Sequence, residues 1–148
     1  MLDITNNFIN PDKCNFLINF FKDHIDLIKS HHTTKALNLS DRKLLPDLQT
    51  ELNLAVEGRG VEIDWCEIVQ WPTWSFQPFH YDFASKETKL TSVVNLNEDF
   101  EGGNTMFIDG TIIAPKKGRI IFFDGVKELH RVTQVTKGER YTLAIWYK

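Results

Sequence analysis

The chain has 148 residues and a formal net charge of −3 at pH 7. This length fits one domain with its own hydrophobic core, so we expect residues 1–148 to form a single domain. The small net charge does not favour a nucleic-acid partner, and no run of about 18 apolar residues is present that would span a membrane.

The first predicted helix begins near residue 10. Residues 10–12, Asn-Pro-Asp, offer a capping side chain, a proline for the first helical position and an acid for the first turn. Apolar residues then recur at steps of three and four, which predicts one buried stripe. That stripe consists of Cys14, Leu17, Phe21, Ile25 and Ile28.

A second helix is predicted over about residues 46–57, before Gly58 and Gly60. Its expected buried face consists of Leu48, Leu52, Ala55 and Val56. The intervening segment, 30–41, is predicted to be a polar loop. We expect both helices to support the remainder of the domain, so that helical support covers about residues 1–60.

From about residue 61 the pattern changes to short apolar runs, separated by turn dipeptides that contain glycine. Asp109-Gly110 between two such runs predicts a tight hairpin. About eight short strands with regular turns indicate a double-sheet jelly roll, also called a double-stranded β-helix. The fold is therefore expected to be α+β, mainly β, with both helices on one outer face and a jelly-roll core over about 61–148. The predicted strands lie within 61–69, 79–83, 90–96, 105–108, 111–114, 119–123, 130–135 and 140–147.

The two cysteines, Cys14 and Cys66, lie in no CxxC motif or Cys/His cluster, so they predict no zinc site. One disulfide would be possible, but the pattern favours two buried, reduced thiols. Residues 1–4 show no basic region followed by an apolar run, and so no signal peptide is indicated. A cytoplasmic location is the corresponding prediction.

The sequence His80-Tyr81-Asp82 offers two metal ligands. Side chains two residues apart on a strand point to the same face, so His80 and Asp82 would project together. The neighbours Phe79 and Phe83 share the parity of Tyr81 and would bury the other face. An HxD sequence alone is weak evidence, since exposed strands often carry such residues.

A second histidine, His130, follows Asp82 by 48 positions. In an antiparallel sandwich, a strand that far along the chain can return beside the first. Two histidines and a carboxylate form the facial triad of non-haem Fe(II) oxygenases, which leaves coordination positions open for other molecules. Zinc fits less well, because structural zinc sites are closed by four protein ligands.

Arg140 begins the last predicted strand, ten residues after His130. It shares one face with Thr142, Ala144 and Trp146. If that face lines the interior, a buried guanidinium needs a partner, and a ligand carboxylate held by two hydrogen bonds is a natural one. The alternative is a surface arginine after the turn at 137–138.

From residue 71 to 147 the chain resembles the catalytic domain of the prolyl 4-hydroxylase-like 2-oxoglutarate and Fe(II)-dependent dioxygenases. The resemblance covers about half of the chain, in the order and spacing of its motifs. Trp146 lies six residues after Arg140, where related enzymes also carry a tryptophan. The matching stretches are 80–82 (HYD), 96–105 (LNEDFEGGNT), 115–118 (PKKG), 122–123 (FF), 130–132 (HRV) and 138–141 (GERY).

This resemblance implies a role for each matching residue. His80, Asp82 and His130 would hold Fe(II), and Arg140 would pair with the distal carboxylate of 2-oxoglutarate. The expected cofactor and cosubstrates are therefore Fe(II), 2-oxoglutarate and O2, with ascorbate as a further candidate. The remaining cosubstrate-binding candidates are Thr142, Trp71 and Trp146.

The resemblance also has departures that bear on the cosubstrate pocket. Trp71 and Asn95 each occupy a position where some relatives carry tyrosine, and an indole donates a hydrogen bond but accepts none. Related halogenases have a small residue in place of Asp82, so its presence implies hydroxylation. Whether the aromatic residues Trp71, Trp74, Phe76 and Phe79 line the substrate entrance or belong to the core stays open.

The leading functional hypothesis is a hydroxylase that acts on a prolyl residue of a peptide or protein. A hydroxylase of a free amino acid or another small molecule is the alternative within the enzymes. A non-catalytic jelly-roll binding module is the alternative outside them, and it would have lost a metal ligand or the arginine. His80, Asp82, His130 and Arg140 are all present, which favours an enzyme.

Overall fold

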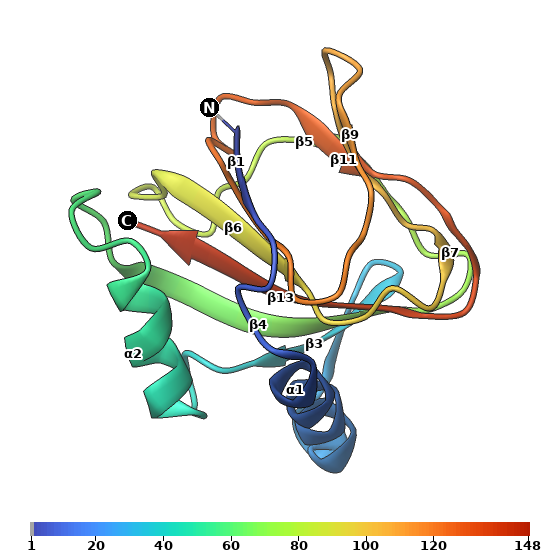
Figure 1. Cartoon of the computed structure of the whole chain (residues 1–148), viewed down its shortest axis with the longest axis horizontal. Helices are drawn as coiled ribbons and strands as arrows, with labels where there is room; N and C mark the ends of the chain where they lie inside the picture. The colour runs from blue at the N-terminus through green and yellow to red at the C-terminus, as the bar shows by residue number, and fades with distance from the viewer. Residues whose placement is uncertain (1) are drawn as a thin grey trace.

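Residues 2–148 are described by the computed structural model. Antiparallel strands form two main sheets, and two helices lie on one outer face of the larger sheet (Figure 1). This is the jelly-roll fold predicted from the alternating runs. The elements are β1 (Leu2–Thr5), α1 (Pro11–Asp23), a 3-10 turn (Ile25–Leu27), β2 (Lys29–His31), β3 (Thr34–Asn38), α2 (Pro46–Leu54), β4 (Ile63–Trp71), β5 (Gln77–His80), β6 (Leu90–Asn95), β7 (Glu101–Gly102), β8 (Thr105–Phe107), β9 (Ile112–Ile113), β10 (Ile120–Phe123), β11 (His130–Val132), β12 (Val135–Lys137) and β13 (Arg140–Tyr147).

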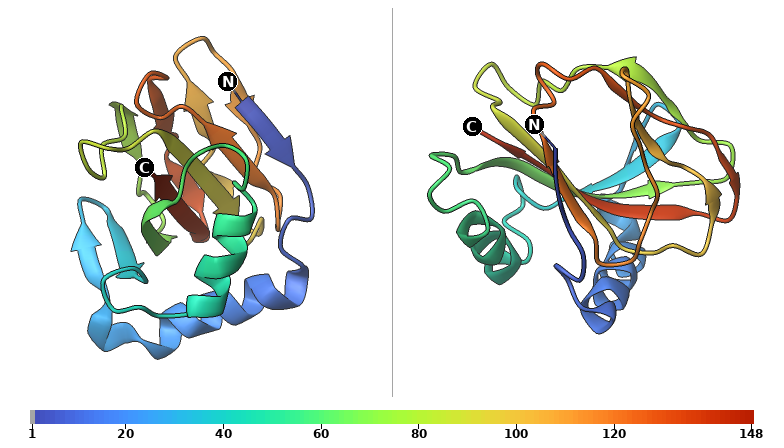
Figure 2. Two further views of the ribbon diagram at one scale, coloured as in Figure 1. Left: turned by 90° about the vertical axis from the view of Figure 1, so that its left-hand side faces the viewer. Right: turned by 45° about the horizontal axis from the view of Figure 1, so that its top comes forward.

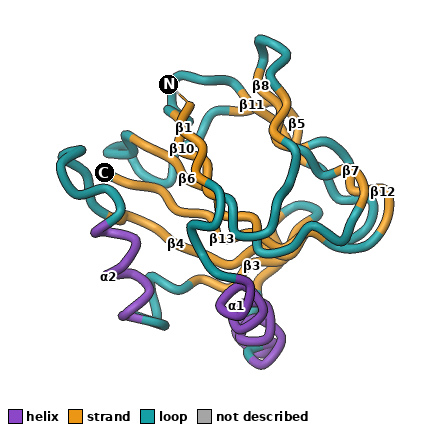
Figure 3. Tube along the Cα trace, viewed as in Figure 1, coloured by secondary structure: helices purple, strands orange, loops and turns teal. Residues whose placement is uncertain are grey.

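The larger sheet has the strand order β1-β10-β6-β13-β4-β3-β2, and we call it the major sheet. The four-stranded sheet β5-β11-β8-β9 is the minor sheet, and β12 pairs separately with β7. In two further views the helices stay on the side of the major sheet that faces away from β5 and β11 (Figure 2). The minor sheet carries no helix, and loops connect most of its short strands (Figure 3).

Helix α1 begins as predicted and ends earlier than predicted. The side chain of Asn10 caps it by accepting a hydrogen bond from the backbone N–H of Lys13, at 2.8 Å. The helix stops at Asp23, and a 3-10 turn follows. The predicted continuation of the apolar stripe is therefore wrong at Ile25, which is 76% exposed, because the changed helical geometry turns it away from the sheet.

Helix α2 is also shorter than the predicted 46–57, since it ends at Leu54. Leu48, Leu52 and Val56 are buried as expected, whereas Ala55 is only partly buried. Gly58 and Gly60 follow with φ values of +86° and +69°, a backbone region that favours glycine.

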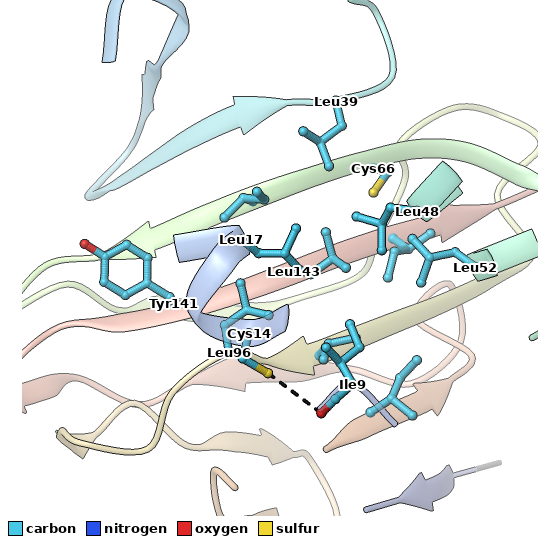
Figure 4. Close-up of a cluster of buried hydrophobic side chains, with 14 of the residues drawn as sticks. Ile9, Cys14, Leu17, Leu39, Leu48, Leu52, Cys66, Leu96, Tyr141 and Leu143 are labelled. Atoms are coloured by element: carbon cyan, nitrogen blue, oxygen red, sulfur yellow. Dashed lines mark hydrogen bonds between the residues drawn. The ribbon is translucent and has the colours of Figure 1, made fainter. Parts of the chain in front are cut away.

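The main hydrophobic core lies between the helices and the major sheet (Figure 4). Alternate residues of β13 enter this core, and Leu143 and Ile145 have no exposed surface. Full burial of one such side chain stabilises the fold by about 1.5–3 kcal/mol. Both cysteines are buried, free thiols within the same core, as predicted. The opposite face of β13, which carries Arg140, is thereby held toward the minor sheet.

Two predictions for the N-terminal part are corrected by the structure. Segment 30–41 is not a loop, because β2 and β3 form a hairpin and β3 pairs with β4. Strand β1, which was not predicted, pairs with β10. These short strands contribute few buried side chains, so their pairing with the major sheet decides their conformation. Residues 2–60 thus contribute strands to the major sheet as well as the two helices.

Several strand boundaries in the C-terminal part also differ from the predictions. The predicted strand 79–83 ends at His80, and the predicted strand 130–135 is divided into β11 and β12. The tight hairpin at Asp109-Gly110 is confirmed, since it joins β8 to β9 and Gly110 has φ +92°. Among residues 2–148, no helix is long and apolar enough to serve as a membrane span.

Candidate metal and cosubstrate site

His80 and His130 lie opposite each other in the minor sheet. They are register partners in the antiparallel strands β5 and β11, and their ring centroids are 4.3 Å apart. The two histidines are 50 residues apart in sequence, but they meet because β11 lies between β5 and β8 in the minor sheet. The sheet therefore places two imidazoles on one face, as the spacing predicted.

Asp82 reaches the same place from a loop, not from the strand that was predicted. Its backbone N–H donates to the carbonyl of Gly125 at 2.8 Å, and Thr91 on β6 donates its hydroxyl to Oδ2 at 2.9 Å. A Cβ atom at Gly125 would collide with both Asp82 Oδ2 and Thr91 Oγ1. Gly125 and Thr91 thus fix the carboxylate, whereas the residue pattern at Asp124-Gly125 indicates only a turn.

The predicted burial of the opposite side of this segment is wrong. Phe79, Tyr81 and Phe83 are 36%, 47% and 67% exposed. The minor sheet carries no covering layer, so the outward side chains of β5 meet solvent. His80 and Asp82 nevertheless point inward, because they contact each other and His130.

The carboxylate of Asp82 is shared by both histidines. Nε2 of His80 lies 3.2 Å from Oδ1, and Nε2 of His130 lies 3.2 Å from Oδ2. Burial by itself raises the pKa of Asp82, but the hydrogen bonds to His130 and His80 outweigh it and hold the pKa well below its usual range. Burial lowers the pKa of His80, whereas its contact with Asp82 raises it, and the net shift is upward.

The two imidazoles are oriented for metal binding by their second nitrogen. Nδ1 of His80 lies 2.7 Å from the carbonyl of Pro78, and Nδ1 of His130 lies 2.7 Å from the carbonyl of Glu128. With the proton on Nδ1, the Nε2 lone pair is available to a metal. One ligand atom from each of His80, Asp82 and His130 lies within 4.8 Å of the others. This donor set fits Fe(II) with positions left for further ligands.

Arg140 is buried in the interior, as its strand position predicted, and is 2% exposed. Its Nη2 donates to Thr105 Oγ1 at 3.3 Å, while Nε and Nη1 are buried and find no hydrogen-bond partner among residues 2–148. Burial lowers its pKa to about 9. A buried guanidinium with two unsatisfied nitrogens is costly, and an anionic carboxylate would neutralise its charge and accept hydrogen bonds from it.

Trp71 and Thr142 lie beside this guanidinium. In the pairing of β4 with β13, Trp71 is the register partner of Arg140, and Thr142 is the register partner of Val69. The Trp71 indole donates a hydrogen bond to Thr142 Oγ1 at 3.3 Å. The guanidinium carbon of Arg140 lies 5.0 Å from the Trp71 ring centroid, a cation–π distance. The indole that replaces the tyrosine of some relatives therefore orients Arg140 and Thr142.

One cavity of about 130 Å³ joins the metal triad to Arg140. Thr142, Trp71 and Trp146 all line it, as the residues proposed for cosubstrate binding should. Asn95 is buried and is the register partner of Thr142 on β6. Along β13, Arg140 lies at one end of the cavity, Thr142 in the middle and Trp146 at the other end. Trp146 is the register partner of Thr91, whose hydroxyl holds Asp82.

The entrance to the cavity includes residues for which the sequence indicated no role. His31 and His32, at the tip of the β2–β3 hairpin, line it together with Phe76. The hairpin is attached there, because Thr33 Oγ1 donates to the carbonyl of Phe76 at 3.1 Å. Of the aromatic residues left open above, Trp71 and Phe76 line the cavity, whereas Trp74 is 63% exposed.

Comparison with known proteins agrees with this geometry. The sequence model of the 2OG-Fe(II) oxygenase superfamily matches residues 69–148. Human 2-oxoglutarate and iron-dependent oxygenase domain-containing protein 3 is 40% identical over 62 residues, which cover 39% of this chain and 19% of that protein. Human prolyl 3-hydroxylase 2 is 38% identical over 64 residues, which cover 38% of this chain and 9% of that protein. The chain thus matches a fifth or less of the length of these curated relatives.

Solved structures share the fold over almost the whole chain. The viral collagen prolyl hydroxylase of Paramecium Bursaria Chlorella virus-1, in complex with 2OG, has a TM-score of 0.78 and 21% identity, over 99% of this chain and 94% of that chain. A prolyl hydroxylase from Trichoplax adhaerens, in complex with a hypoxia inducible factor peptide fragment, has a TM-score of 0.74 and 18% identity, over 99% and 82% of the two chains.

The family match covers more than half of the chain, and its metal ligands converge in the structure. The chain belongs to the 2OG-Fe(II) oxygenase superfamily. Its fold is that of the prolyl hydroxylases, and membership of the family implies Fe(II), 2-oxoglutarate and O2 as cofactor and cosubstrates.

Proposed function

We propose that this chain hydroxylates a prolyl residue of a peptide or protein, with Fe(II) held by His80, Asp82 and His130. The observation that carries the proposal is the single cavity that contains both this triad and the unsatisfied guanidinium of Arg140. One end of the cavity fits a metal and the other end fits an anion, as a metal-chelating dicarboxylate requires.

The residues at the two ends of the cavity would have different roles. Arg140 would hold the distal carboxylate of 2-oxoglutarate, with Thr142 and Trp71 as its neighbours. Asp82, fixed by Thr91 and Gly125, would complete the metal site, which leaves no place for a halide and favours hydroxylation. Bound Fe(II) supplies the oxidative chemistry, and the protein orients the reactants and excludes water from them.

A peptide substrate is favoured by the surroundings of the metal. A groove wider than the cavity contains His80 and Asp82 and is bordered by the exposed side chains of Tyr81 and Phe83. An extended chain fits such an open, partly aromatic groove better than an isolated small molecule does. Several of the similar proteins are prolyl hydroxylases, which also supports a prolyl substrate.

The test is incubation of the protein with proline-containing peptides, Fe(II), 2-oxoglutarate and ascorbate, followed by mass spectrometry. The expected result is a +16 product that is absent with the His130→Ala variant. Free proline and other free amino acids are assayed in parallel, and conversion of these alone would favour the small-molecule alternative. If no substrate gives a product and no succinate forms, the proposal is refuted in favour of a binding module.

A further inference from the structure

A second carboxylate lies on the interior face of the major sheet, outside the metal triad. Glu67 is on β4, on the same side of the strand as Val69 and Trp71, which line the cavity. Glu67 lines this cavity and also the wider groove that contains His80 and Asp82. The neighbouring cavity-lining residues of β4, Val69 and Trp71, are apolar and aromatic, so a carboxylate on this face of the strand is unexpected.

The register of the major sheet places Glu67 across the cavity from the metal site. Glu67 pairs with Ala144, and Ala144 pairs with Val93 on β6. Thr91 lies two residues before Val93 on the same strand, and its hydroxyl donates a hydrogen bond to Asp82. With strands about 4.8 Å apart, Glu67 lies roughly 10 Å from Val93 along this row. The residue between them in this row is Ala144, whose side chain is a single methyl group.

The carboxylate of Glu67 is only half satisfied by the protein. Oε2 accepts a hydrogen bond from the indole N–H of Trp65 at 3.0 Å, and Oε1 has no hydrogen-bond partner among residues 2–148. Burial raises the pKa of Glu67, while the Trp65 hydrogen bond and the charge of His31 oppose that shift. Lys29 and Arg42 are exposed at the groove, but neither forms an ion pair with Glu67 within the described residues.

The aromatic side chains next to Glu67 suit a cationic group. Trp65 and Trp146 are register partners on β4 and β13, and both line the groove. Indole rings attract ammonium and guanidinium ions, most strongly where water is excluded. A partly buried carboxylate with one unused oxygen, beside two indoles, therefore has the features of a cation-binding subsite.

We propose that Glu67 is a specificity residue that binds a cationic group of the substrate while the carbon to be hydroxylated faces the metal. The inference rests on the proposed function and adds the chemical class of substrate. The cation is an ammonium or a guanidinium. Its source is either a lysine or arginine near the target proline of a peptide, or the α-ammonium group of a free amino acid.

The experiment compares matched substrates with charge variants of Glu67. The peptides contain one proline and differ at a single neighbouring position, which is lysine, norleucine or glutamate, and the position is moved along the peptide. Free amino acids are compared with their N-acetyl forms. The variants are Glu67→Gln, which keeps an acceptor for the Trp65 indole, and Glu67→Lys, which reverses the charge. Glu57→Gln is the control, since Glu57 is exposed after α2.

The wild type should prefer the lysine peptide at one position, or the free amino acid over its N-acetyl form. In Glu67→Gln this preference should fall about tenfold, the loss expected for one charge-assisted hydrogen bond. Glu67→Lys should instead prefer the glutamate peptide, and Glu57→Gln should behave like the wild type. An equal loss of activity toward cationic and neutral substrates would show that Glu67 has only a structural role in β4. That result would overturn the inference.

The formation of succinate from 2-oxoglutarate separates failure of this inference from failure of the proposed function. If the wild type forms succinate and hydroxylates the proline peptides but has no preference for a cationic substrate, the inference is wrong and the proposed function stands. If no succinate forms, the proposed function is wrong. The cation preference is then decided by calorimetric binding of the same peptides and amino acids to the wild type and to Glu67→Gln, and equal affinity for both would overturn it.

Discussion

His80 and His130 are register partners in neighbouring strands, with their ring centroids 4.3 Å apart. Hydrogen bonds to backbone carbonyls orient both rings, so that each Nε2 is directed at a different oxygen of Asp82. Three ligand atoms are thus preorganised by strand pairing and by short local contacts. The predictions below test this arrangement and the anion site at the other end of the cavity.

The loss of His130 should abolish tight iron binding. Anaerobic titration of the wild type should show about one Fe(II) per chain, and His130→Ala should bind it at least about 100-fold more weakly, because only two ligands remain. His24→Ala is the matched control, since His24 follows α1 and lies outside the cavity. Unchanged iron affinity in His130→Ala would refute the assignment of the triad.

Thr91 should act as a positioning residue for the metal. The Thr91→Val substitution keeps the shape of the side chain but removes the hydroxyl that donates to Asp82 at 2.9 Å. Iron affinity should fall by about 10- to 100-fold, the usual effect of removing a hydrogen bond to a ligand. Thr50→Val on α2, whose hydroxyl also donates a hydrogen bond, should have no effect on iron. Equal affinities in the two variants would assign Thr91 to packing alone.

Gly125 should tolerate no side chain. In Gly125→Ala the new methyl group would meet Asp82 Oδ2 and Thr91 Oγ1, so the carboxylate must move. We expect a folded protein with strongly weakened iron binding, measured by the same titration alongside circular dichroism. Its φ lies outside the left-handed region that favours glycine, so backbone strain would not explain the effect. Wild-type affinity in this variant would show that Asp82 is not held as described.

Arg140 should determine the affinity for 2-oxoglutarate. Arg140→Ala should reduce the formation of succinate in the absence of substrate by about 100-fold or more, because a desolvated, two-point ion pair is lost. Arg140→Lys retains the charge and should lose less. Arg59→Ala removes a partly exposed arginine that pairs with Asp3, and it serves as the control. An unchanged KM for 2-oxoglutarate in Arg140→Ala would contradict the assignment.

Cys66 should not react with thiol reagents while the protein is folded. It is fully buried, and burial raises the pKa of its thiol well above the usual range, so thiolate is absent at pH 8 and an increase to pH 9.5 should not produce it. A disulfide-exchange reagent should modify Cys66 only as fast as the protein unfolds. The rate in denaturant is the reference, and rapid modification of the native protein would contradict the burial.

Much of the C-terminal half could be predicted from residue patterns. Strand β13 was predicted with its observed bounds, 140–147, because its apolar and polar faces alternate and glycine turns precede it. The same alternation placed Arg140, Thr142 and Trp146 on one face, and all three line the cavity. Local periodicity is informative here because both faces of the strand are packed.

The N-terminal strands and the entrance could not be predicted in the same way. Strands β2 and β3 consist mostly of polar residues, and only their pairing with β4 makes them part of the major sheet. Phe79, Tyr81 and Phe83 were expected to be buried, but the minor sheet has no covering layer. Patterns of polarity do not reveal whether another element covers a face.

The sequence by itself indicated the candidate metal ligands, the arginine that accompanies them and the bounds of the last strand. It did so because two histidines, one aspartate and one arginine lie at spacings that antiparallel strands can bring together. Only the tertiary structure decided that Gly125 and Thr91 hold Asp82 and that Glu67 lines the same cavity as His80, Asp82 and His130. Those contacts join residues of different strands and loops, and their geometry arises only when the sheets have paired.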